Sequence, residues 1–175
     1  MNSNAPTLYP ELEYLGSATR FIEEILQLID QIPFFGGFSD QEIQALTGYM
    51  GCYGAPRKAR LLTEGQTDSH MLLLLTGRAA VLKNDSQGVE KIVAEAGPGT
   101  TLGEMSMIDV SPRSASCVTT EPTDFAVLTR GSLNEIFINS PRLGNKLLLV
   151  LLQLTMRRLR EANDRLLLHA TDRFL

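Results

Sequence analysis

The chain has 175 residues with 16 basic and 20 acidic side chains, so its formal net charge is −4, and 43% of its residues are hydrophobic. These values are close to those of soluble globular proteins and indicate one domain that needs no metal or disulfide to fold. The acidic balance argues against direct nucleic-acid binding, and the two histidines, His70 and His169, are too few for a histidine-rich metal site.

The cysteines and the apolar runs indicate the cellular compartment of the protein. Cys52 and Cys117 are too few for a disulfide framework and fit reduced, half-buried positions in a cytosolic protein. The first residues lack the basic and apolar regions of a secretory leader. The longest apolar run, Leu147–Leu152, is far shorter than the roughly 20 residues that span a membrane. We therefore expect a cytoplasmic protein without a membrane segment.

The N-terminal third predicts an arm followed by helices. Residues 1–16 contain two prolines and a glycine without sustained periodicity, so we expect a flexible arm. Residues 17–50 predict N-terminal helices. Ser17 caps the first, which continues to about Asp30 and ends before a proline. Ser39 opens the second with a capping box, because a glutamate stands three residues later.

Residues 51–130 have the sequence pattern of a β-protein. Short apolar runs alternate with glycine, proline and polar turns about every 8–12 residues, which is typical of a small antiparallel β-sandwich or jelly-roll barrel. With the flanking helices, the expected fold class is α+β. The runs lie at 60–63, 71–76, 79–83, 89–94, 114–119 and 124–129.

Residues 131–175 predict C-terminal helices. A short helix over 131–139 precedes a long one that Ser140 caps and Pro141 opens. Residues 147–154 are apolar almost all the way round, so we expect burial on more than one face.

A heptad stripe continues along the long helix. A parallel homodimer explains this seam, and a helix folded back on its own barrel is the alternative. We interpret the adjacent basic run, Arg157, Arg158 and Arg160, as the solvated flank of that seam. The stripe comprises Leu148, Leu152, Thr155, Leu159, Ala162, Leu166 and His169.

The most distinctive segment is residues 97–118. Its three glycines let the backbone approach a ligand, and amides near Gly103 can donate to an anion. Arg113 offers a planar fork that suits a phosphate, and Ser114 adds a hydroxyl beside it. Glu104 can accept from sugar hydroxyls. One arginine and one carboxylate suit a sugar monophosphate better than a nucleoside triphosphate.

Two common nucleotide-binding motifs do not fit this segment. The phosphate-binding loop motif with its lysine is absent, and the glycine spacing differs from the dinucleotide-binding fingerprint. From spacing alone, Glu104 and Arg113 could equally form an ordinary ion pair across a turn.

Residues 103–118 resemble the phosphate-binding cassette of the cyclic-nucleotide-binding domain family, which includes catabolite activator-type regulators, protein kinase A regulatory subunits and cyclic-nucleotide-gated channels. The matching pattern is Gly103-Glu104, a small-residue helical turn, and then Arg113-Ser114-Ala115. The similarity covers roughly residues 32–168 and includes Glu64-Gly65-Gln66, Leu74–Arg78, Gly88, Gly97-Pro98-Gly99 and Arg157–Arg160.

The resemblance implies a role for each matching residue. Arg113 would pair with the cyclic phosphate, and Glu104 would accept from the ribose 2′-hydroxyl. Ser114 would contact the phosphate, while Gly103 and Ala115 would bring backbone amides to it. The implied ligand-binding set is Gly103, Glu104, Met105, Ser106, Arg113, Ser114, Ala115 and Asn163.

The resemblance also bears on the choice of base. Ser114 favours cAMP over cGMP, because threonine at this position tends to favour guanine in the family. Asn163 would contact the base from the long helix. The sequence departs from the family at Ala162, where catabolite activator-type proteins have a hydroxyl side chain.

The implied function is a stand-alone regulatory module that binds cAMP or cGMP and signals to a protein partner through its C-terminal helix. We expect no catalytic residue, cofactor or metal, and no direct DNA binding, because too little chain follows the helix for a helix-turn-helix domain. One alternative is a degenerate domain kept for dimerisation or docking. Another is a cupin-type metalloenzyme, which the two histidines do not favour.

Overall fold

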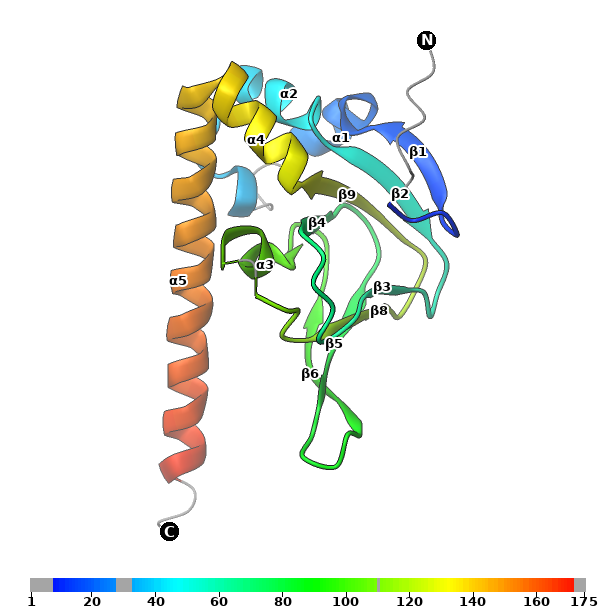
Figure 1. Ribbon diagram of the computed structural model, residues 1–175, viewed down its shortest axis with the longest axis vertical. Coiled ribbons are helices and arrows are strands. Elements are labelled where there is room, and N and C mark those ends of the chain that lie inside the picture. The colour runs from blue at the N-terminus through cyan, green and yellow to red at the C-terminus, as the bar shows by residue number, and fades with distance from the viewer. Residues whose placement is uncertain (1–7, 28–32, 110, 172–175) are drawn as a thin grey trace.

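Two antiparallel sheets form a β-roll, and the long C-terminal helix stands along one side of it (Figure 1). The computed structural model describes residues 8–27, 33–109 and 111–171. Its elements are β1 (Glu13–Ser17), η1 (Ala18–Phe21), α1 (Ile22–Gln27), η3 (Pro33–Phe35), α2 (Asp40–Thr47), β2 (Gly51–Ala55), β3 (Arg60–Leu62), β4 (His70–Leu74), β5 (Ala79–Asn84), β6 (Glu90–Ala96), β7 (Thr101–Leu102), α3 (Glu104–Asp109), β8 (Ser116–Thr119), β9 (Thr123–Thr129), α4 (Arg130–Asn139) and α5 (Pro141–Thr171).

The sheets have five and four strands, in the orders β1-β2-β9-β4-β7 and β3-β8-β5-β6. Each predicted apolar run overlaps a strand, so the expected α+β fold with its antiparallel roll and flanking helices is confirmed. The hairpin of β5 and β6 projects from the roll (Figure 1). Asp85 forms its turn by accepting from the amides of Gln87 and Val89, each at 2.9 Å.

β4 lies between β9 and β7 in the five-stranded sheet and is buried on both faces, which explains its apolar sequence from Met71 to Leu74. Met71 and Leu73 point into a cluster shared with the helices, whereas Leu72 and Leu74 point into the interior between the sheets. This alternation follows the two-residue period of a strand. β4 therefore contributes to two apolar clusters, one shared with the helices and one in the interior of the roll.

The N-terminal caps confirm two predicted helix starts. Ser17 accepts from the amide of Thr19 at 3.3 Å and opens η1, which leads into α1. Ser39 and Glu42 form the capping box of α2, with bonds of 3.3 and 2.8 Å. The predicted end of the first helix near Asp30 lies outside the described residues.

The prediction of a flexible arm over residues 1–16 is wrong for its described C-terminal part. Residues 13–17 form β1, which pairs with β2. This pairing satisfies the backbone groups that β2 would otherwise expose at the sheet edge. Ahead of β1, the ring of Tyr9 packs edge-on against Tyr53 and Phe125, with centroids 5.3 and 5.4 Å apart. Residues 8–16 are thus anchored to the roll.

The C-terminal helices begin where the sequence predicts. Leu147 and Leu151 of α5 are buried, but Leu149 and Leu152 are 59% and 57% exposed. The prediction that residues 147–154 are buried on more than one face of the helix is therefore wrong within this single chain. Along the described part of the chain, no helix has the length and apolar character needed to cross a membrane.

Candidate functional site

A cavity of about 800 Å³ lies between the β-roll, α3 and the middle of α5. Leu62, Val81, Leu102 and Cys117 supply part of its apolar wall. Burial raises the pKa of the Cys117 thiol to about 12, so this side chain is a neutral, apolar surface at physiological pH. Both cysteines are free and buried, deeper than the half-buried positions expected from the sequence.

Gly103 makes the sharp turn between β7 and α3. Its φ is +77°, in the left-handed region that favours glycine. A Cβ at this position would lie 2.2 Å from Nη1 of Arg113, so a side chain would collide with the guanidinium. The carbonyl of Gly103 instead accepts from the same Nη1 at 2.7 Å. The absence of a side chain at Gly103 thus leaves room for the Arg113 guanidinium directly beside the backbone turn.

Arg113 is 3% exposed and is held at three points. Besides Gly103, its guanidinium donates through Nη2 to the carbonyl of His70 at 2.6 Å and through Nε to the carboxylate of Asp68. A guanidinium has five N–H groups, so these three contacts with described residues leave one N–H on each Nη for a ligand. The planar fork is oriented in advance, as phosphate recognition requires.

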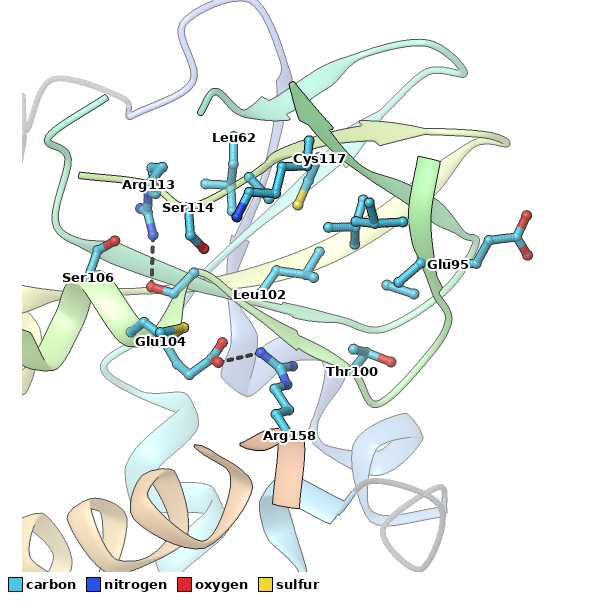
Figure 2. A pocket seen from close by; sticks show the side chains of 18 of the residues that line it. Leu62, Glu95, Thr100, Leu102, Glu104, Ser106, Arg113, Ser114, Cys117 and Arg158 are labelled. Carbon is cyan, nitrogen blue, oxygen red and sulfur yellow. Dashed lines mark hydrogen bonds and ion pairs between the residues drawn. The ribbon is translucent and has the colours of Figure 1, made fainter. Parts of the chain in front are cut away.

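Glu104 is the first residue of α3 and is 1% exposed. Its Oε1 accepts from Nη1 of Arg158 on α5, as Figure 2 shows. Its Oε2 is buried and has no hydrogen-bond partner among the described residues. A buried acceptor without a donor is costly, so a ligand hydroxyl that donated to this oxygen would gain the full bond.

The cavity brings together seven of the eight residues singled out from the sequence. Gly103, Glu104, Met105, Ser106, Arg113, Ser114 and Ala115 all line it. Asn163 does not: it is exposed, and α5 presents Arg158, Glu161 and Ala162 to the cavity instead. The alternative of an ion pair between Glu104 and Arg113 is also not seen, because Glu104 pairs with Arg158 and Arg113 pairs with Asp68.

Sequence reasoning missed Arg158. Its assignment to the solvated flank of the seam is wrong, because it contacts both Glu104 and the carbonyl of Thr101. Helical periodicity cannot reveal a partner 54 positions away. The available signal was chemical: if Arg113 serves a phosphate, a buried Glu104 needs another cation, and the basic run on the long helix offers one.

Asp68 and His70 were also missed as part of the site. The pKa of His70 is lowered to about 4, first by burial and then by the neighbouring Arg113, so the imidazole is neutral near pH 7. Neither residue stands in a recognisable motif, and only the fold brings them to Arg113. Among the residues that the structure describes, no group of three or more histidine, cysteine or carboxylate side chains could hold a metal ion.

Comparison with known proteins gives a consistent result. The family model for the cyclic nucleotide-binding domain matches residues 55–140. The crystal structure of a cyclic nucleotide-binding domain from Methylobacillus flagellatus KT is 49% identical, with a TM-score of 0.82 over 92% of this chain and 90% of that one.

Two curated relatives carry cyclic AMP in their names. The cyclic AMP receptor protein of Thermus thermophilus is 29% identical over 75% of this chain. The CRP-like cAMP-activated global transcriptional regulator of Mycobacterium tuberculosis is 26% identical over 80%. The chain spans 59% and 61% of the lengths of these two relatives. The near-complete match to the Methylobacillus domain and the matched family model together show that this chain belongs to the cyclic nucleotide-binding domain family.

Proposed function

We propose that the cavity binds cAMP and that the chain is a regulatory module whose response is carried by α5. The observation that carries this proposal is the buried Oε2 of Glu104, which has no hydrogen-bond partner among the described residues and lies in a cavity that Arg113 also lines. A ribose hydroxyl is a donor for the carboxylate, and a cyclic phosphate is a monoanion that suits a single guanidinium. One ligand supplies both groups.

Each part of the ligand has a matching surface. The phosphate would take the remaining N–H groups of Arg113 and the hydroxyl of Ser114, which is exposed in the cavity. The base would lie against the apolar wall that Val81 and Leu102 help to form. The names of the two relatives of this chain support cAMP, and Ser114 favours it over cGMP.

Arg158 gives the ligand a route to α5. The ribose hydroxyl and Arg158 would share the carboxylate of Glu104, so ligand binding changes the contact that holds α5 against the roll. Such a switch needs different ligand affinity in two positions of the helix. We therefore propose that α5 carries the signal to a protein partner, with no catalytic step and no cofactor.

We further propose that α5 forms a homodimer in the cytoplasm. Leu149, Leu152 and Leu159 are each more than half exposed along this helix. An apolar stripe of this kind is stabilised by a second helix. The free, buried cysteines fit a reducing compartment.

A thermal-shift titration with cAMP, cGMP and cyclic di-GMP tests the function. At 100 times the dissociation constant a ligand adds about 2.7 kcal/mol, which for a chain of this size raises the melting temperature by roughly 5–10 °C. We expect cAMP to produce this shift in the wild type. Glu104→Gln should weaken the response, and Arg113→Ala should abolish it.

The comparison must use the shift caused by ligand, because Arg113→Ala also removes the partner of Asp68 and lowers the starting melting temperature. A response to cGMP or cyclic di-GMP alone would correct the ligand assignment. No response of the wild type to any of the three would contradict the proposal and favour a docking module without a small ligand.

A further inference from the structure

A second polar network joins the N-terminal segment to the roll. The hydroxyl of Tyr9 donates to the carbonyl of Leu61 at 2.8 Å and lies 2.8 Å from Nε2 of His70. Because the hydroxyl has one proton and Leu61 takes it, Nε2–H of His70 donates to the Tyr9 oxygen. The network thus assigns one tautomer to the neutral imidazole, and leaves its Nδ1 without a hydrogen-bond partner among the described residues.

Residues 8–12, which we name the strap, are held mainly by Tyr9. Its ring packs edge-on against His70 with the centroids 5.6 Å apart, in addition to its contacts with Tyr53 and Phe125. Leu12 packs against the same interior cluster, and its amide donates to the carbonyl of Tyr9 at 3.2 Å. Burial raises the pKa of the Tyr9 hydroxyl, so it remains protonated and available as a donor.

His70 connects the strap to the cassette. Its ring contacts Tyr9, and its carbonyl accepts from Nη2 of Arg113. Asp68, two residues earlier, takes the Nε of the same guanidinium. Two of the three contacts that orient Arg113 therefore come from residues 68–70. The strap holds the His70 ring of this same segment.

We propose that the strap is a regulatory element and that Tyr9 and His70 are positioning residues for the ligand-binding arginine. This inference rests on the proposed cyclic-nucleotide function. The docked strap keeps the carbonyl of His70 directed at Arg113, and release of the strap loosens that contact. Linkage is reciprocal, so bound nucleotide must also stabilise the docked strap by the same factor.

Hydrogen exchange on the wild-type chain tests the linkage without any substitution. We expect saturating cAMP to slow exchange at residues 8–12, including the Leu12 amide.

Calorimetric titration of variants tests the same linkage from the side of ligand affinity. Tyr9→Phe removes the hydroxyl and should weaken cAMP binding by about three- to tenfold, the size of one hydrogen bond, and reduce the ligand-dependent protection.

Matched variants separate positioning from packing. Tyr14→Phe is the control, because Tyr14 is 53% exposed and packs on Tyr53 in the same part of the chain. His70→Leu should weaken binding like Tyr9→Phe. His70→Gln, which keeps a donor near the position of Nε2, should restore most of the lost affinity.

Failure of the strap proposal can be told apart from failure of the function. A wild type that binds no cyclic nucleotide overturns both. A wild type that binds cAMP without protecting residues 8–12 overturns the strap alone. So does a Tyr9→Phe variant that melts earlier but binds cAMP with unchanged affinity, because that result assigns Tyr9 a purely structural role.

Discussion

At the scale of single residues, two glycines with the same backbone conformation have different roles. Gly88 and Gly103 both have a φ of +77°. At Gly88 an added Cβ meets no described atom within 4 Å, whereas at Gly103 it meets the Arg113 guanidinium. Substitution at Gly88 therefore tests backbone strain alone, whereas substitution at Gly103 tests strain together with a collision with Arg113.

Alanine at each position should reveal this difference. Gly88→Ala should cost about 1 kcal/mol of stability from strain alone and leave cAMP affinity unchanged. Gly103→Ala should cost more and weaken cAMP binding at least tenfold, because it displaces Arg113. Urea unfolding and calorimetric titration measure the two quantities. Equal cAMP affinity in the two variants would contradict the role assigned to Gly103.

The sequence was informative at this scale only where residues form a local motif. Glu104, Arg113 and Ser114 stand within one cassette, so their types and spacing indicated a sugar phosphate. Asp68 and Arg158 reach the site from 45 and 54 positions away in the chain. Their contribution depends on where the fold places α5 and the segment that leads into β4, and only the fold provides that information.

At the scale of elements, the strands with clear apolar runs were predictable and those without were not. β2 contains two glycines, β7 has only two residues, and β1 follows a stretch rich in proline. None of the three has the alternation that identifies a strand from its own sequence. Each is instead held by pairing, β1 on β2 and β7 on β4.

The exposed leucines of α5 give an element-scale prediction. We expect the wild type to sediment as a dimer and Leu152→Glu to sediment as a monomer at the same concentration, since a carboxylate in an apolar seam is strongly unfavourable. Gln153→Glu adds the same charge at a neighbouring exposed position and should remain dimeric. A monomeric wild type would contradict the proposed seam.

At the scale of the whole molecule, buried His70 makes folding sensitive to acid. Its pKa is lowered to about 4 in the folded protein, so between pH 6.5 and 4 the unfolded chain binds a proton that the folded chain does not. Stability from this group is complete above pH 6.5 and is lost as the pH falls towards 4.

Urea unfolding at a series of pH values measures this loss. We expect the free energy of unfolding to fall by about 2–4 kcal/mol over this range because of His70. His70→Gln cannot take up the proton and should show a correspondingly flatter profile, whereas His169→Gln, which alters the other histidine, should keep the slope. Parallel profiles for wild type and His70→Gln would rule out His70 as the source.

The ion pair between Glu104 and Arg158 ties the cassette to α5 in a further respect. Loss of Arg158 leaves the buried carboxylate of Glu104 without its cation, and loss of Glu104 removes an anion that holds α5 against the cassette. Because each side chain is the partner of the other, we expect a change at one position to be less harmful when the other position changes with it. A chimera that joins the β-roll of one homologue to the long helix of another therefore has to keep this pair matched. This holds even though the two chains are joined at a point distant from both residues.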